Sequence, residues 1–96
     1  MRLPTTFHIL GHDVTVYRVK TGFYTSKKLA ECNDETGEIH VKEGLLPSIE
    51  EMTVLHEVIH MIDGLMDIGL SEDQTSQLGN GLYQFLHDNN FDVRKK

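Results

Sequence analysis

The stretch that decides the fold of this chain runs from Ser48 to Met66 and reads SIEEMTVLHEVIHMIDGLM. Its apolar residues recur every three to four positions, which is typical of an α-helix packed against other elements. Ser48 with Glu51 three residues later is a capping-box pattern, and Pro47 precedes it. We therefore predict a helix from about residue 49 to about residue 65.

The centre of this helix carries the motif HEVIH, from His56 to His60. Residues four apart lie on one face of a helix, so both imidazoles can bind the same metal ion. The glutamate after the first histidine can then act as general base on the water that the metal activates. The motif predicts His56 and His60 as ligands of one Zn²⁺ and Glu57 as the catalytic residue.

The polar face of the helix also favours a metal site. On a helical wheel, His56, His60 and Asp63 share a narrow polar stripe, and much of the remaining circumference is apolar. A solvated stripe is usually built from Lys, Arg, Glu and Gln, yet no Lys or Arg occurs between Lys42 and Arg94. This composition indicates a metal site more than a plain solvent-facing surface.

A second helix is predicted from about residue 72 to about residue 88, because Ser71 with Gln74 repeats the capping-box pattern. Its predicted core stripe consists of apolar residues and one threonine: Thr75, Leu78, Leu82, Phe85 and Leu86. Glu72 lies at the edge of this stripe beside the small residues Ser76 and Gly79, which would let the two helices approach closely.

Catalytic zinc usually has three protein ligands. The candidates for the third ligand are acidic residues and one histidine near the motif: Asp63, Asp67, Glu72, Asp73 and His87. Glu72 is preferred and Asp63 is the alternative. For Glu72 to reach the metal, the first helix must end early, near Gly64.

The first 42 residues are predicted to form strands. Phe7 to Leu10 and Val14 to Val19 are rich in β-forming residues, and Gly11-His12-Asp13 between them indicates a hairpin turn. Leu29 to Cys32 and the strictly alternating Glu38 to Lys42 form a second predicted pair. The segment from Thr21 to Lys28 gives no clear signal. Strands followed by helices predict one α+β domain over residues 1–96, with a small antiparallel sheet of three or four strands.

Composition limits the partners and the compartment. The chain has 96 residues and a net charge of −6, and its only basic cluster is Arg94 to Lys96, so we expect no nucleic-acid partner. No apolar run is long enough to span a bilayer, so we expect no membrane association. The single Cys32 cannot form an internal disulfide, which favours a cytoplasmic location. In so short a chain, bound zinc could contribute to stability.

Several smaller candidates have both a functional and a structural interpretation. Ile39 and Val41 could lie on an edge strand that pairs with an extended peptide, or on an ordinary core strand. Tyr83 could stabilise a developing oxyanion or simply pack. Cys32 could bind and mask zinc, although a lone loop cysteine is usually inert.

Glu38 to Asn90 resembles the small HExxH proteins of bacteriophages and prophages, which are related to the ImmA/IrrE-type metallopeptidases. The residues that carry the resemblance form four segments: Ile39-His40-Val41, Thr53 to Asp63, Leu70 to Gln74, and Gly81 to Leu86. The resemblance implies a minimal zincin-like fold, with His56 and His60 as ligands, Glu57 as general base, and Glu72 as third ligand. The glutamate-alanine-asparagine signature of larger members reads Gln74-Thr75-Ser76 here.

We therefore expect a zinc-dependent metallopeptidase that hydrolyses a peptide or protein substrate, such as a regulatory protein. One alternative is a non-catalytic, zinc-stabilised protein-binding module of a phage or mobile element. Another is a metal-free interaction domain in which HEVIH is accidental. Neither the substrate nor the oligomeric state follows from the sequence.

Overall fold

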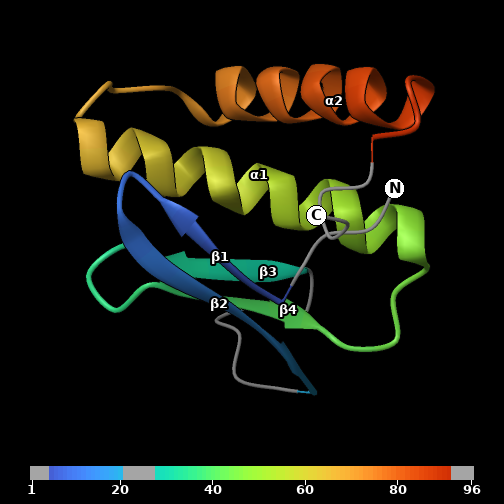
Figure 1. The fold of residues 1–96 in the computed structure, drawn as a ribbon, viewed down its shortest axis with the longest axis horizontal. Helices are drawn as coiled ribbons and strands as arrows, with labels where there is room; N and C mark the ends of the chain where they lie inside the picture. Colours follow the sequence, from blue (N-terminus) through green and yellow to red (C-terminus); the bar gives the residue numbers. More distant parts are fainter. Residues whose placement is uncertain (1–4, 21–27, 92–96) are drawn as a thin grey trace.

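The computed structural model describes residues 5–20 and 28–91. They form four strands followed by two helices: β1 (Thr6–Ile9), β2 (His12–Val19), β3 (Ala30–Asn33), β4 (Glu38–Lys42), α1 (Pro47–Met66) and α2 (Glu72–Asp88). The predicted α+β class, a small sheet followed by two helices, is confirmed (Figure 1). Most of the segment that gave no clear signal, 21–27, lies outside the described residues, as does the basic cluster 94–96.

The sheet has the strand order β1-β2-β4-β3. The outer pairs β1–β2 and β3–β4 are antiparallel, but the central pair β2–β4 is parallel. The sheet is therefore mixed, and the prediction of a purely antiparallel sheet is wrong in this respect. Local hairpin signals indicate which neighbouring strands pair, but they carry no information on how two hairpins join.

The first hairpin shows how local chemistry sets a turn. Ile9 pairs with His12, so only Leu10 and Gly11 form the loop. Both have positive φ, 50° for Leu10 and 82° for Gly11, as a two-residue type I′ turn requires. The turn thus lies one residue earlier than predicted, because β2 already begins at His12.

The helices form two further layers on one face of the sheet. In Figure 1, α1 lies on the sheet and α2 lies on the far side of α1. The core between the sheet and α1 contains Val14, Ile39, Val41 and Met61, each at most 1% exposed. Because α1 is the middle layer, it needs apolar or buried residues around much of its circumference, as the helical wheel indicated.

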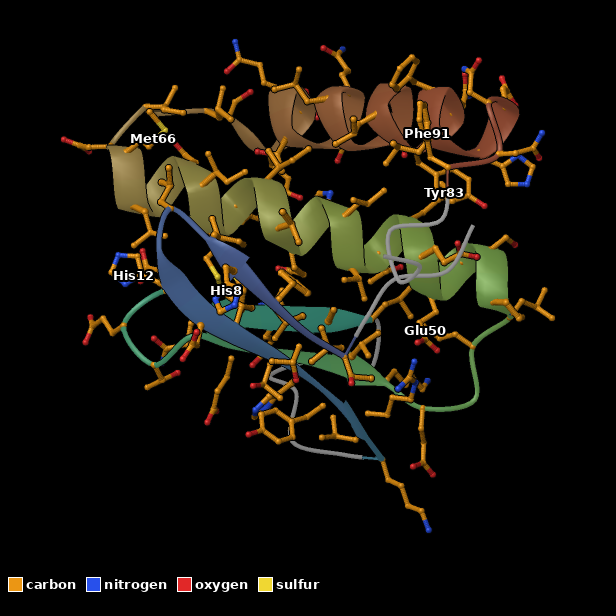
Figure 2. All side chains as sticks on the ribbon, viewed as in Figure 1. His8, His12, Glu50, Met66, Tyr83 and Phe91 are labelled. Atoms are coloured by element: carbon orange, nitrogen blue, oxygen red, sulfur yellow. The ribbon has the colours of Figure 1, made fainter. Side chains whose placement is uncertain are left out.

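The start of α1 differs from the prediction. The helix begins at Pro47 with Leu46 as N-cap and no capping side chain, so the predicted Ser48 capping box does not form. Glu51 is buried, at 9% exposed. An ion pair between Arg18 of β2 and Glu50 joins this end of α1 to the sheet (Figure 2). The α2 capping box of Ser71 and Gln74 is present as predicted.

Neither helix within the described ranges has both the length and the apolar character that crossing a membrane requires.

Candidate metal centre

Three side chains from the two helices converge at the middle of α1. His56 and His60 have ring centroids 4.7 Å apart. The Nε2 atoms of His56 and His60 lie 2.6 Å and 3.0 Å from the two carboxylate oxygens of Glu72. Each residue offers one donor atom, and these donors lie within 4.8 Å of one another. Two imidazole nitrogens and a carboxylate are a donor set that suits zinc, so the residues fit the metal that the motif predicts.

Glu72 reaches the histidines because the connection between the helices reverses sharply. α1 ends at Met66, and Asp67 follows in the left-handed conformation, with φ 54°. Ser71 then caps α2, so Glu72 is the first residue of the new helix. The first helix does not need to end near Gly64, because the four residues from 67 to 70 complete the reversal.

Asp63, the alternative third ligand, is positioned for a different role. Its Oδ1 atom accepts hydrogen bonds from the backbone N–H groups of Gly69 and Leu70, at 2.7 Å and 3.1 Å. Its backbone carbonyl accepts from the N–H group of Asp67. Asp63 therefore holds the connection that delivers Glu72, and it does not belong to the converging donor group.

The close packing of α2 on α1 depends on a small residue. A Cβ atom added at Gly79 would lie 3.5 Å from the Cα of His56 and 3.6 Å from the Cδ1 of Ile59. This is van der Waals contact with the backbone that carries the first histidine, so a larger side chain would separate the helices. The close approach that the sequence indicated at Gly79 is confirmed.

Glu57 lies on the side of α1 that faces β3 and is only 7% exposed. Burial raises the pKa of the Glu57 carboxyl, whereas His60, His56 and a side-chain hydrogen bond with Cys32 lower it, and the net shift is upward. A carboxylate with a raised pKa is a stronger base, which suits proton transfer near neutral pH.

Cys32 is the neighbour of Glu57 that the sequence did not reveal. It lies on β3, and its thiol forms a side-chain hydrogen bond with Glu57. Burial and the negative charge of Glu57 raise the pKa of Cys32 to about 12. The thiol therefore stays protonated and acts as a hydrogen-bond donor to the carboxylate. Cys32 is not one of the converging donors, so the structure gives it a different role from the masking ligand considered above.

A cleft of about 720 Å³ opens over these residues. Its lining comes from β3, the adjoining Lys28 and Leu29, and one face of each helix: Lys28, Leu29, Ala30, Glu31, Cys32, Met52, Thr53, His56, Glu57, His60, Glu72, Ser76 and Asn80. Within the described residues, β3 pairs only with β4, so its other edge pairs with no strand. The cleft thus joins an edge strand to the candidate metal ligands.

The register of β3 determines which backbone groups face that open edge. The Leu29 carbonyl accepts from the Lys42 N–H group, so this pair is hydrogen-bonded across the β3–β4 ladder. Pairing alternates along an antiparallel ladder, so the N–H and C=O groups of Ala30 and Cys32 point away from β4. Ala30 is only 4% exposed, whereas Cys32 is half-buried, so of these groups those of Cys32 are the more accessible from the cleft.

Three predicted contact residues lie elsewhere. Ile39 and Val41 are fully buried on β4, which is an interior strand, so they cannot pair with a substrate and the core interpretation is correct. Tyr83 lies between α1 and α2 near the end of α2 (Figure 2). Its ring packs at 5.6 Å from that of His87, and it does not line the cleft. The packing interpretation of Tyr83 therefore fits the structure.

Sequence reasoning missed the part of the site that β3 supplies. Cys32, Ala30 and Leu29 reach the cleft through long-range strand order, which leaves no local signal. Ser76 was recognisable, because it follows Glu72 by one helical turn and so shares its face.

No family model, curated protein or solved structure matches this chain.

Proposed function

We propose that this protein is a zinc-dependent metallopeptidase, with His56, His60 and Glu72 as metal ligands and Glu57 as general base. The single observation that carries the proposal is the convergence of the two imidazoles and the Glu72 carboxylate beside the buried Glu57. The same class of activity is implied by the resemblance to ImmA/IrrE-type metallopeptidases. The free thiol of Cys32 suits a reducing cytoplasm.

Zinc bound to these ligands would act as a Lewis acid that acidifies water and polarises a peptide carbonyl. Glu57 would accept the proton from the attacking water and transfer it to the leaving nitrogen. The hydrogen bond from Cys32 would hold the Glu57 carboxylate in one orientation, because the thiol is fixed on a strand of the sheet.

The substrate that fits the cleft is an extended peptide. Its backbone would pair with the edge of β3 through the outward N–H and C=O groups of Cys32, as in β-strand addition. This pairing would position a peptide bond beside Glu57 and the metal ligands, since all line the same cleft. We therefore assign the pairing with an extended peptide to β3, and not to the strand that contains Ile39 and Val41.

Metal binding is tested first, by metal analysis and zinc titration of the purified protein. We expect one zinc per chain. Glu72→Gln should weaken zinc affinity by more than about tenfold, because one of three ligands is lost. Asp73→Asn is the matched control, since it removes a neighbouring exposed charge and should leave affinity unchanged. Equal affinities for the two variants would contradict the assignment of Glu72.

Catalysis is tested with Glu57→Gln, which keeps the shape of the side chain but cannot accept a proton. We expect the variant to bind zinc and to lose at least about a hundredfold in turnover of a peptide library. Proteolysis that continues at the wild-type rate would refute the general-base role.

A second function is favoured by the way α2 is attached. Only Thr75, Gly79 and Tyr83 of α2 are buried, so a metal held by both helices would add a substantial link. Under this proposal the protein is a non-catalytic, zinc-stabilised protein-binding module. It predicts that chelation lowers the melting temperature while no member of the peptide library is cleaved.

A further inference from the structure

One flank of α2 carries an apolar stripe that is largely exposed in the described part of the chain. Leu78, Leu82 and Phe85 are 52%, 40% and 55% exposed. They follow one another at helical spacing and so form a single face, which we name the α2 stripe. Phe91 extends it, with its ring 5.5 Å from that of Phe85 and itself 46% exposed (Figure 2).

This arrangement contradicts the predicted core stripe at Leu78, Leu82 and Phe85, whereas Thr75 is buried as predicted. α2 packs on α1 through Thr75, Gly79 and Tyr83, a face rotated away from Leu78 and Phe85. The α2 stripe is therefore left for a contact outside the described chain. Ser76 and Asn80, which line the cleft, lie on the opposite side of the helix, so a partner on the α2 stripe would leave the cleft open.

Charge indicates what kind of partner fits. The chain has a net charge of −6, yet Gln74 to Leu86 contains no charged side chain. Two copies of an acidic protein repel each other over most of their surface, and a neutral apolar face is where they can meet. An antiparallel pair of α2 helices would bring two such neutral faces together.

The geometry of the α2 stripe is self-complementary in that orientation. Its centre falls between Gly81 and Leu82, close to the middle of a helix of 17 residues. A two-fold axis there would place Leu78 of one copy against Phe85 of the other. Gly81 would lie at the crossing point, and a Cβ atom added there meets nothing within 4 Å among the described residues. Glycine disfavours helix, and packing within residues 5–20 and 28–91 gives no reason for it; close approach of a second helix does.

We propose that two copies of this chain form an antiparallel homodimer through the α2 stripe. The proposal is independent of metal binding and peptidase activity.

Sedimentation velocity of the full-length protein tests it, at concentrations up to about 200 μM. We expect a concentration-dependent monomer–dimer equilibrium. Leu82→Glu should raise the dissociation constant by at least about tenfold, because it places two like charges at the centre of the contact. Gln84→Glu adds the same charge to α2 away from the α2 stripe and should change the constant far less.

A wild-type protein that sediments as a monomer throughout this range would overturn the proposal and leave a different protein as the partner. A dimer whose dissociation constant is the same in Leu82→Glu and in wild type would also overturn it. Leu82 is 40% exposed, so its variant should fold, and circular dichroism verifies this.

Discussion

Glu57 combines two properties at the residue scale that are hard to obtain together. It is buried, which raises its pKa and strengthens it as a base. It also lies beside two histidines and a thiol, which stabilise the negative charge of its carboxylate. Its neighbour in sequence, His56, points into the same cleft with a half-buried ring. A single helical segment thus supplies both the candidate ligands and the candidate base.

The reactivity of Cys32 provides a prediction about this pair. A pKa raised from 9.0 to about 12 lowers the thiolate fraction near pH 8 by about a thousandfold. Alkylation by iodoacetamide should therefore be slow, and its rate should increase about tenfold per pH unit from pH 7 to pH 10, because only the thiolate reacts. The rate is measured by mass spectrometry on the folded protein.

Glu57→Gln should accelerate this alkylation, because it removes the negative charge that disfavours the thiolate. Glu35→Gln, in the exposed turn between β3 and β4, is the matched control and should not. Labelling as fast as that of an unfolded peptide would contradict the contact between Cys32 and Glu57.

At the scale of the elements, the connection between α1 and α2 leads to a prediction about stability. Asp63→Ala removes the acceptor of two backbone hydrogen bonds and should lower the free energy of unfolding by about 1–3 kcal/mol. Asp63→Asn keeps an oxygen that can accept both bonds, so it should be much less destabilising. Denaturant titration of the two variants measures the difference.

The same two variants separate the structural role of Asp63 from a ligand role. If Asp63 holds only the connection, Asp63→Asn should bind zinc with wild-type affinity. A large loss of affinity in Asp63→Asn, in a protein of unchanged stability, would instead favour Asp63 as the third ligand.

The elements show how much of the fold the sequence could predict. Both helices and both hairpins follow from local patterns, and their bounds differ from prediction by one to two residues at most ends. The parallel β2–β4 pair could not be predicted, because it joins residues distant in the chain. The predicted packed face of α2 included Leu78, Leu82 and Phe85 because they are apolar, but the helix packs through Thr75, Gly79 and Tyr83, and only Thr75 and the close approach at Gly79 were predicted.

The residues of the candidate site likewise differ in whether a local sequence pattern could predict them. His56, Glu57 and His60 were identifiable because their chemistry is encoded within one helical turn. Glu72 was identifiable from the cap of the next helix and its small neighbours. The contribution of β3 was not, because no local pattern indicates that Cys32 lies against Glu57.

For the whole molecule, zinc should contribute to stability as well as chemistry. Zinc at about a hundred times its dissociation constant should add about 2.7 kcal/mol, if the unfolded chain does not bind it. Chelation should therefore lower the melting temperature by about 10 °C or more in a domain of this size. Scanning calorimetry with and without a chelator measures this shift.

The size of that shift should depend on pH. Protons compete with zinc for the ligands, so the stabilisation should be present at neutral pH and decrease as the solution is acidified. The Glu72→Gln variant should show a smaller shift at every pH. A melting temperature that changes neither on addition of the chelator nor in the Glu72→Gln variant would contradict a metal shared by the two helices.

The parallel pair at the centre of the sheet has a consequence for how the chain folds. β1–β2 and β3–β4 are local hairpins that can form within microseconds. Joining them requires Thr15 to find Glu38 and Val19 to find Lys42, which closes a long loop before any contact compensates for the lost entropy. We expect this docking to limit the folding rate. His56, His60 and Glu72 are all near one another in sequence, so zinc can bind before this docking step and should speed folding more than it slows unfolding.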